Sequence, residues 1–429
     1  MTLFDDLKWR GLVYDSTPEI ERRLADEKVT AYIGFDPTAS SLHVGSLLPI
    51  MALARLQRFG HSPIAVVGGG TGLIGDPSGK TVERQLLTVE QVELNIEGIR
   101  KQLERFLDFD ARANPARVVN NHDWLGTIRL VEFLRDVGKH FTVNYMLAKE
   151  SVKRRVTSDE GISFTEFSYM LLQAYDFVVL HDRYDCTLQL GGSDQWGNIV
   201  AGAELIRRMR GGIADGLVLP LVTNAAGTKF GKTEAGTVWL DPARTSPYRF
   251  YQFWLNADDR DVGNYLRMFT WLDEPEIVGL EEDARRDPGR REAQHRLAAE
   301  VTSMVHGESE RDRAVRASSV LFGGGLSELT ASDLIDIFEE VPSSQVDRDA
   351  FDSDGMPVID LVVGHTGLAS SRGEARRLVQ GGGLRINDRP IADETHRVQV
   401  EDAIEGMLFV VKKGKKSYHL VRLGPRNGV

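Results

Sequence analysis

The beginning of the chain alternates apolar strands with an amphipathic helix, and this alternation restricts the possible fold more than any other feature of the sequence. The segments A-Y-I-G-F (31–35) and I-A-V-V-G (64–68) are predicted to be buried strands. Residues 47–59 between them are predicted to form a helix, and Gly60 ends it as a C-terminal cap. A strand, a helix and a strand at this spacing predict a parallel sheet in an α/β fold.

The composition is that of a globular protein with several domains. The 429 residues are 41% hydrophobic and 27% charged, and no apolar run approaches the roughly 18–20 residues of a membrane span. The first residues carry charges where a signal peptide needs an apolar core, so we expect a cytoplasmic protein that enters no membrane. Cys186 is the only cysteine, which excludes a disulfide framework and a cysteine-based zinc site within the chain, and no metal site is predicted.

The sequence pattern changes near Ser246 and Pro247, which together make a good helix start. Helical patterns follow, and then an acidic, turn-rich stretch precedes a compact mixed unit. The predicted order is a Rossmann-like parallel-sheet domain with an inserted helical segment (1–222), a mobile loop and connection (223–245), an all-helical domain (246–341), a linker (342–356) and a small α+β domain (357–429).

The small domain at the end of this order is basic, whereas the body is acidic. The formal net charge of the whole chain is −11. Residues 356–429 contain 12 Lys and Arg against 8 Asp and Glu, while residues 1–355 contain 40 against 55. This contrast indicates either a polyanionic partner or a solvated charged face, and charge alone does not separate the two. Inside the basic unit we predict a helix starting at Ser370 or Ser371 and a turn at Asn387-Asp388.

A glycine-rich loop follows the second predicted strand and matches two phosphate-binding patterns imperfectly. G-T-G-L-I-G (70–75) has the dinucleotide-binding spacing, but the turn-forming residues 76–79 follow it where a helix should start. I-G-D-P-S-G-K-T (74–81) resembles a P-loop whose first glycine comes one position late. We therefore favour a tight strand-to-helix turn, in which Asp76 places a carboxylate near the strand ends, where α/β sheets bind ligands.

Two further segments carry polar residues in unusual surroundings. Residues 164–177 predict a helix with Tyr169, Gln173 and Asp176 on one face. That face lacks Lys, Arg and Glu, so it is either an unusual solvated face or the lining of a site for a small polar ligand. In G-G-S-D-Q-W-G-N (191–198), framing glycines place Asp194 and Gln195 on a tight turn.

A lysine-containing loop, T-N-A-A-G-T-K-F-G-K-T (223–233), places Lys229 and Lys232 three residues apart between glycines. It is either a basic surface turn or a flexible clamp for a polyphosphate.

Taken in order, these segments resemble bacterial-type tyrosyl-tRNA synthetases, which are class I aminoacyl-tRNA synthetases. The resemblance runs essentially end to end and rests on six segments: A-Y-I-G-F-D-P-T-A-S-S-L-H-V-G-S, G-G-x-T-G-L-I-G-D-P-S-G-K, F-L-R-D-V-G-K-H-F-T-V-N-Y-M, F-T-E-F-S-Y-M-L-L-Q-A-Y-D, L-G-G-S-D-Q-W-G-N and T-K-F-G-K-T. Each segment alone is a weak signal, whereas all six in order are a strong one.

The resemblance implies that L-tyrosine and ATP form tyrosyl-AMP and pyrophosphate, and that tyrosine is then transferred to the 3′ end of tRNA(Tyr). It implies Mg²⁺ with the ATP, no permanently bound cofactor and a homodimer. The sheet domain becomes the catalytic domain, the helical domain becomes an anticodon-side tRNA domain, and the last domain resembles an RNA-binding domain shared with a ribosomal protein. Its implied tRNA-binding residues are Arg372, Arg376, Arg377 and Arg385.

The family's other roles fall on matching residues. The phenolic hydroxyl of tyrosine is bound by Tyr32 and Asp176, its ammonium by Asp76, Tyr169 and Gln173, and its carboxylate lies beside Gln195. The implied ATP site includes Gly34, Asp36, Ser46, Gly192 and Asp194. Pyrophosphate departs against Thr38 and His43, with Lys229, Lys232 and Thr233 as the mobile clamp.

Two positions depart from the broader class. The lysine loop reads K-F-G-K-T in place of K-M-S-K-S and keeps both lysines, and Ser46 stands where H-x-G-H has its second histidine. We predict that Ser46 caps the helix beginning at Leu47 and keeps a short polar group near the nucleotide. The alternatives are an inactive RNA-binding relative, a dehydrogenase resting on G-T-G-L-I-G, and a tryptophanyl enzyme of similar architecture.

Overall fold

The computed structural model describes residues 1–76, 87–156, 161–225, 230–233, 236–320, 325–326, 329–339, 341–351, 354–414 and 417–424. By its internal contacts the chain forms two units. The first unit consists of residues 1–245 and 254–305, and the second consists of residues 246–253 and 306–429.

A six-stranded sheet forms the centre of the first unit, with the strand order β1-β6-β5-β2-β3-β4. The strands are β1 (Asp15–Ser16), β2 (Thr30–Phe35), β3 (Ser62–Val67), β4 (Arg117–Asn120), β5 (Cys186–Gly192) and β6 (Asp215–Leu219). All neighbours run parallel except β1, which pairs antiparallel with β6. The predicted parallel α/β fold is therefore confirmed, and the strands predicted at 31–35 and 64–68 are present as β2 and β3.

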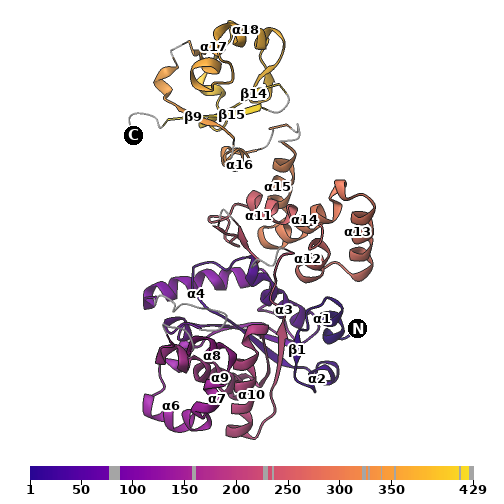
Figure 1. Cartoon of the computed structure of the whole chain (residues 1–429), viewed down its shortest axis with the longest axis vertical. Helices are drawn as coiled ribbons and strands as arrows, with labels where there is room; N and C mark the ends of the chain where they lie inside the picture. The colour runs from indigo at the N-terminus through magenta and orange to yellow at the C-terminus, as the bar shows by residue number, and fades with distance from the viewer. Residues whose placement is uncertain are drawn as a thin grey trace. The chain divides into compact units, whose positions relative to one another are not determined.

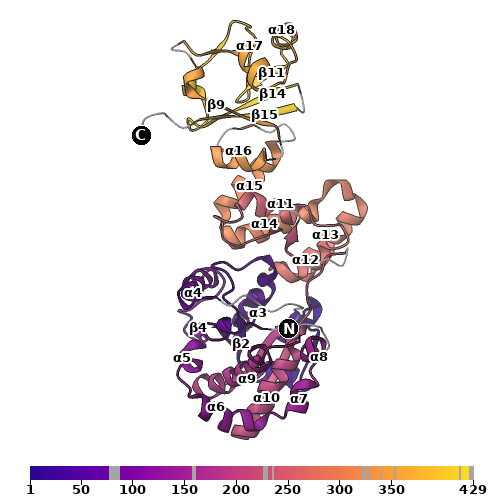
Figure 2. The ribbon, with the colours of Figure 1, turned by 60° about the vertical axis from the view of Figure 1, so that its left-hand side comes forward.

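Helices cover both faces of this sheet (Figures 1 and 2). Helix α3 (Leu47–Arg58) packs on one face, and α9 (Phe164–Tyr184) and α10 (Trp196–Arg210) pack on the other. The predicted helix after the first strand is thus confirmed, and it ends before Gly60, which has a φ of +92°. Tyr32 and Val66 pack with Phe177 of α9 in one buried cluster, so the sheet face toward α9 forms part of the core.

The predicted insertion between β4 and β5 is helical. It contains α5 (His122–Leu125), α6 (Leu130–Asp136), α7 (Val143–Leu147) and α8 (Glu150–Val156). Helix α4 (Val89–Leu103) precedes β4. Among the residues that the structure describes, no helix is both long and apolar enough to cross a membrane.

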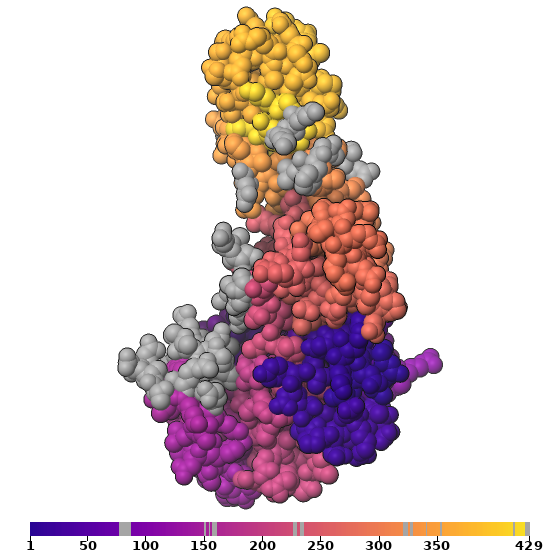
Figure 3. Space-filling model, turned by 45° about the vertical axis from the view of Figure 1, so that its right-hand side comes forward, coloured from indigo at the N-terminus to yellow at the C-terminus, as the bar shows by residue number. Residues whose placement is uncertain are grey.

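The first unit also contains α1 (Leu3–Trp9), α2 (Ile20–Asp26), α12 (Val262–Phe269), α13 (Glu274–Arg286) and α14 (Glu292–His306). Buried charges tie the end of α1 to α12 and to the residues that directly follow it. Arg10 pairs with Asp6 and donates to the carbonyls of Arg267 and Leu272 at 3.0 and 2.9 Å. Burial lowers the pKa of Arg55, which also pairs with Asp6, to about 9. Figure 3 shows the indigo N-terminal segment beside the orange helical segment of the same unit.

A five-stranded sheet forms the centre of the second unit, with the order β12-β11-β14-β15-β9. Its strands are β9 (Ser343–Val346), β11 (Leu384–Ile386), β12 (Arg389–Pro390), β14 (Leu408–Lys413) and β15 (Ser417–Leu423). Strand β9 runs parallel to β15. The prediction of a linker at 342–356 is therefore wrong, because four of its residues complete the sheet through backbone hydrogen bonds that a polar sequence does not reveal.

Side chains alternate across β14 and β15, so each face of this sheet has its own core. Leu408, Val410 and Leu420 pack with residues of α16 (Ala331–Ile337). Phe409, Val411 and Val421 pack with residues of α17 (Val358–Asp360) and α18 (Arg372–Gln380) on the other face. Figure 1 shows α16 on one side of the sheet and α17 and α18 on the other.

Local predictions for this unit are confirmed. Ser371 caps α18, since its hydroxyl oxygen accepts from the backbone N–H of Glu374 at 3.2 Å. Asn387 and Asp388 both have positive φ in the turn between β11 and β12. The helices α11 (Pro247–Leu255) and α15 (Glu308–Val320) also form, and Ser246 accepts from Arg249 N–H at 3.3 Å. The contacts divide the predicted helical region 246–341 between the two units.

Candidate active site

A cavity of about 200 Å³ opens in the first unit at the carboxyl ends of β2 and β5, where parallel sheets bind ligands. Strands supply its floor, and α9 and the turns after β3 and β5 supply its walls. Nine of the residues proposed from the sequence line it: Tyr32, Gly34, Asp36, Asp76, Tyr169, Gln173, Asp176, Gly192 and Gln195. The polar face predicted for the 164–177 helix thus lines a cavity.

One end of the cavity holds a buried carboxylate. Asp176 accepts hydrogen bonds from the indole Nε1 of Trp124 at 2.7 Å and from Nδ2 of Asn121 at 3.0 Å. Burial raises the pKa of Asp176 to about 7, although both hydrogen bonds act in the opposite direction. Asp176 therefore changes charge near neutral pH.

Two buried polar groups near Asp176 are unsatisfied among the residues that the structure describes. They are the hydroxyl of Tyr32 and the Oε1 of Gln189. These residues are direct partners on the neighbouring strands β2 and β5, so their side chains lie on the same face of the sheet. Since an unpaired buried polar group costs about 1–3 kcal/mol, a ligand with a polar end is the natural partner of this part of the cavity.

The other end of the cavity is a network of amides and carboxylates. Gln195 donates from Nε2 to Asp76 at 2.8 Å, and its Oε1 accepts from Asn198 at 3.1 Å and from Gln173 at 3.3 Å. The hydroxyl of Tyr169 donates to Asp36 Oδ1 at 3.3 Å. Acceptors concentrated in this way suit a cationic group such as an ammonium.

The glycine-rich loop delivers Asp76 to this network by a turn. After β3 the chain forms a single 3₁₀ turn at Thr71–Leu73, and the amide of Gly70 donates to Asn121 Oδ1 at 2.8 Å. Asp76 is buried, and Gly75 before it has a φ of +89°. The described part of the loop is thus a turn after β3, while residues 77–86, through which the predicted strand-to-helix turn would continue, lie outside the described residues.

Sequence reasoning missed Asn121, Trp124, Gln189 and Asn198. The first two belong to N-N-H-D-W (120–124), a polar run directly after a strand, which is a signal for a ligand-binding edge. Gln189 is an amide between two buried leucines of β5, which is unusual for a strand buried on both faces.

Thr38, His43, Ser46 and Asp194, which the resemblance implies for ATP and pyrophosphate, do not line this cavity. Asp194 lies next to it, since its Oδ2 accepts from Gln195 at 3.4 Å. His43 Nδ1 accepts from the amide of Gly45 at 3.0 Å, so a neutral ring carries its hydrogen on Nε2 and has a donor there. Its ring packs edge-on against Trp239, with the ring centres 6.3 Å apart.

The predicted capping role of Ser46 is wrong. A 3₁₀ turn at Val44–Ser46 precedes α3, so Ser46 has near-helical backbone angles, and its side chain makes no capping hydrogen bond. A capping side chain needs extended backbone angles, which His43 has, and it is His43 that accepts from a backbone N–H here.

We expect Ser46→Ala to change the free energy of unfolding by less than about 0.5 kcal/mol and to leave amino-acid activation intact. The matched control is Ser163→Ala, because the Ser163 hydroxyl caps α9 by accepting from Glu166 N–H at 3.2 Å. This control should lose about 1 kcal/mol in chemical denaturation. A folded Ser46→Ala protein without activity would instead make Ser46 a catalytic group.

The lysine loop is described only in part. Lys229 lies outside the described residues, and Lys232 and Thr233 are described as backbone in β7 (Lys232–Thr233), which pairs with β8 (Gly236–Thr237). The backbone after the loop contacts the His43 segment, since Val44 N–H donates to Val238 O at 3.0 Å. A Cβ on Gly231 would lie 2.7 Å from Val44, so this approach requires glycine.

The proposed RNA-binding arginines lie in the second unit. Arg372, Arg376 and Arg377 are exposed on α18, and Arg385 is exposed on β11. Arg372 pairs with Asp360 at 2.5 Å, and Arg376 approaches Glu394 at 3.8 Å. These exposed guanidinium groups are in reach of an external polyanion.

Comparison with known proteins agrees with this geometry. The family model described as tRNA synthetases class I (W and Y) matches residues 24–323, and that of the tyrosine–tRNA ligase SYY-like C-terminal domain matches residues 333–421. A tyrosine–tRNA ligase of Roseiflexus castenholzii is 60% identical over 98% of this chain and 99% of its own length. One of Bacillus caldotenax is 52% identical over 98% of this chain and all of its own.

A solved structure of a C-terminally truncated mitochondrial tyrosyl-tRNA synthetase of Aspergillus nidulans also aligns with the chain. It has a TM-score of 0.68 and 31% identity, and the alignment covers 75% of this chain and 94% of that one. The fold and the site therefore define a class I tRNA synthetase. Within that class, the chain belongs to the tyrosine–tRNA ligase family and is an aminoacyl-tRNA ligase.

Proposed function

We propose that this chain activates L-tyrosine with ATP in the cavity at the ends of β2 and β5, and then transfers tyrosine to the 3′ end of tRNA(Tyr). The observation that carries this assignment is the end of the cavity around Asp176, where a buried carboxylate lies near two unsatisfied polar groups. A phenol is the side-chain end that satisfies such a site.

The phenolic hydroxyl of the substrate donates to Asp176 and bonds with Tyr32, and Gln189 Oε1 offers a further acceptor on the same floor. Phenylalanine would leave the Tyr32 hydroxyl and Gln189 Oε1 without partners and would add none to Asp176, and each unpaired group costs about 1–3 kcal/mol. Discrimination between the two amino acids therefore follows from the cavity floor.

The α-amino and carboxylate groups of tyrosine occupy the other end. Asp76, Tyr169 and Gln173 hold the ammonium, for which the amide and carboxylate network supplies oxygen acceptors. Gln195 lies beside the carboxylate of the substrate tyrosine. It positions this group through its Nε2, the atom that donates to Asp76 in the structure.

ATP enters as its Mg²⁺ complex, with the ribose near Gly34, Asp36, Gly192 and Asp194 and its phosphates near Thr38, His43 and the Ser46 turn. The tyrosine carboxylate is already ionised at neutral pH, so it attacks the α-phosphate without a general base. The bond from the α-phosphate to the bridging oxygen breaks, and pyrophosphate leaves. Donors on His43, Thr38 and the loop residues Lys229, Lys232 and Thr233 stabilise the charge on the leaving group.

The test is ATP–pyrophosphate exchange without tRNA, run with each of the twenty amino acids. We expect exchange with tyrosine alone. Exchange with tryptophan would move the assignment to the related tryptophanyl enzymes, and folded protein without any exchange would favour an RNA-binding relative that has lost activation.

The pKa of Asp176 predicts a pH dependence. Because burial raises the pKa of Asp176 to about 7, the carboxylate that accepts the phenol is lost as the pH falls below 7. We expect kcat/KM for tyrosine to fall up to tenfold per pH unit below that midpoint. Trp124→Phe removes a hydrogen bond that lowers this pKa, so the midpoint should move upward.

The measurement is exchange from pH 5.5 to 8.5, with Trp9→Phe on α1 as the matched control. An unchanged or lower midpoint in Trp124→Phe would contradict the assigned link between Asp176 and tyrosine binding.

The support for tRNA as the second substrate is the basic, exposed face of α18 and β11. Because an enzyme that charges tRNA supplies the ribosome, we propose that the chain works in the cytoplasm.

We also propose a homodimer, supported by exposed apolar side chains gathered between β4 and the start of α9. They are Leu130, Val131, Leu134, Val143 and Phe164. Leu130 and Val131 are 71% and 75% exposed, respectively.

We expect Leu130→Asp/Val131→Asp to halve the mass measured by sedimentation equilibrium, since charge opposes burial of this surface. Tyr14→Asp, at a residue 67% exposed, is the control, and an unchanged mass in the double variant would exclude this surface.

A further inference from the structure

Helix α4 runs beside the chain segment that carries Asp36, Thr38 and His43. Residues Asn95, Gly98 and Gln102 follow one another at helical spacing on the side of α4 that faces this segment. None of the three belongs to the tyrosine cavity.

Each of these residues contacts the segment. Asn95, which is fully buried, donates from Nδ2 to Pro37 O at 2.8 Å. Gly98 passes so close that an added Cβ would lie 2.0 Å from Ser40 O. Gln102 accepts from Leu42 N–H at 2.8 Å, immediately before His43.

Gln102 makes a second bond that extends the connection. Its Nε2 donates to Ser41 Oγ at 2.9 Å, and the same hydroxyl oxygen accepts from the backbone N–H of Asp241 at 3.2 Å. Leu240 N–H donates to Leu42 O at 2.9 Å. Gln102, Ser41, Leu42 and Asp241 therefore form one polar junction, here called the Gln102 junction.

The junction joins both segments that the proposed function places on the ATP phosphates. One is the His43 segment. The other is the segment that follows the lysine loop and continues to Asp241. Within it, Val238 O accepts from Val44 N–H, and Val238 N–H donates to Gly231 O. Gln102 bonds to the first segment directly and is linked to the second through Ser41. It therefore sets the distance between the two groups of proposed phosphate donors.

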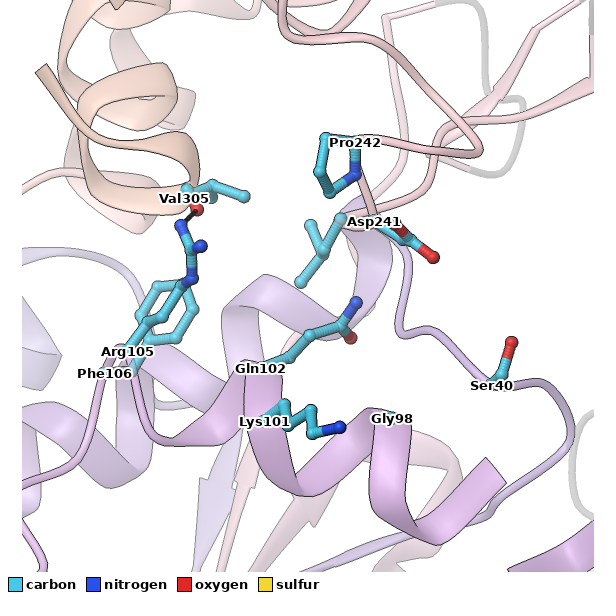
Figure 4. Close-up of a pocket in the computed structure, with 10 residues that line it drawn as sticks. Ser40, Gly98, Lys101, Gln102, Arg105, Phe106, Asp241, Pro242 and Val305 are labelled. Atoms are coloured by element: carbon cyan, nitrogen blue, oxygen red, sulfur yellow. Dashed lines mark hydrogen bonds between the residues drawn. The ribbon is translucent and has the colours of Figure 1, made fainter. Parts of the chain in front are cut away.

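A second cavity, of about 260 Å³, lies on the outer side of the junction (Figure 4). Lys101, Gln102, Arg105, Asp241 and Val305 are among its lining residues, and at one edge of it Arg105 donates to Val305 O at 2.6 Å. Because Gln102 borders open space on this side, a side chain of similar size can replace it without overpacking the core.

We propose that Gln102 is a positioning residue for ATP activation, which holds the His43 segment and the exit of the lysine loop in register through the Gln102 junction. The inference rests on the proposed function. Pyrophosphate stabilisation depends on donors held within a fraction of an ångström, so loosening their support affects the ATP step. Tyrosine binding depends on a different set of residues and is spared.

The test compares Gln102→Leu, Gln102→Glu and Lys101→Ala in ATP–pyrophosphate exchange, with tyrosine binding measured separately by calorimetry without ATP. Gln102→Leu removes both hydrogen bonds, whereas Gln102→Glu keeps an acceptor for Leu42 N–H and loses the donor to Ser41. Lys101, whose side chain is 70% exposed, lines the same cavity outside the junction and is the matched control.

We expect Gln102→Leu to lower kcat/KM for ATP at least tenfold while the Kd for tyrosine stays within twofold. Gln102→Glu should recover part of the loss, and Lys101→Ala should behave as wild type. Loss of thermal stability with unchanged kcat/KM for ATP, or an equal loss of tyrosine affinity, would overturn the inference.

Ser41→Ala provides a second route to the same junction if Gln102→Leu fails to fold. The double variant Ser41→Ala/Gln102→Glu should lose no more than the worse single variant, because both changes break one connection, whereas additive losses would count against the junction. Wild-type protein without tyrosine-dependent exchange would overturn the proposed function as well. Normal wild-type exchange with an unaffected Gln102→Leu variant overturns this inference alone.

Discussion

Asp176→Ala is expected to lower kcat/KM for tyrosine in ATP–pyrophosphate exchange by roughly 100- to 1000-fold. The substitution removes a hydrogen bond to a charged acceptor and leaves the substrate phenol in the buried site without that partner, while the lost bonds of Asn121 and Trp124 affect folding stability. Together these losses amount to about 3–4 kcal/mol. The preference for tyrosine over phenylalanine should fall in the same proportion, since phenylalanine never used the carboxylate.

The kinetic comparison includes Asp182→Ala, on the same helix, as control. Asp182 is partly exposed and pairs with Arg210 at 2.6 Å, away from the cavity lining. Asp176→Asn tests the role of charge with a side chain of the same shape. A loss below tenfold in folded Asp176→Ala, or an equal loss with phenylalanine, would remove Asp176 from tyrosine recognition.

Arg376→Glu/Arg377→Glu is expected to raise the KM for tRNA by roughly 10- to 100-fold at low salt, while exchange without tRNA stays unchanged. Each reversal replaces an attraction to a phosphate with a repulsion, and the difference shrinks as salt rises. Both side chains are exposed on α18, so the cost to folding should be small. The measurement is aminoacylation at several salt concentrations beside exchange in the same buffers.

Lys8→Glu/Arg22→Glu, with two exposed basic residues of the first unit, gives the same change in net charge as a control. If it raises the KM for tRNA as much, general charge rather than α18 accounts for the effect. Equal losses of charging and exchange in the α18 variant would contradict a separate tRNA-binding role for that helix.

Much of the fold follows from local pattern. The strands β2 and β3, the helix α3 and the polar face of α9 all show a periodicity that the sequence displays directly. Ser46 illustrates the limit of such reasoning. The sequence predicts the helix start at Leu47 correctly, but a 3₁₀ turn precedes it and gives Ser46 near-helical backbone angles that prevent capping. The capping atom then came from His43, three residues earlier.

Long-range partners explain what local pattern missed. Trp124 and Asn121 become site residues only because α9 brings Asp176 to them from more than fifty positions away. Gln189 belongs to the site because its strand pairs with that of Tyr32. Likewise, the segment 343–346 has no strand signal of its own, and its place in the sheet is set by β15.

That pairing of β9 with β15 has a consequence during protein synthesis. The parallel partner of β9 ends at Leu423, so the sheet of the second unit closes only after the ribosome has released almost the whole domain. Roughly 75 residues separate the end of β9 from the end of β15. At a synthesis rate of about 5–20 residues per second, this stretch takes on the order of 4–15 s. During this interval the apolar side of α16, which later packs on β14 and β15, has no sheet to cover it. Nascent chains at this stage are the point at which chaperone binding or aggregation should be greatest.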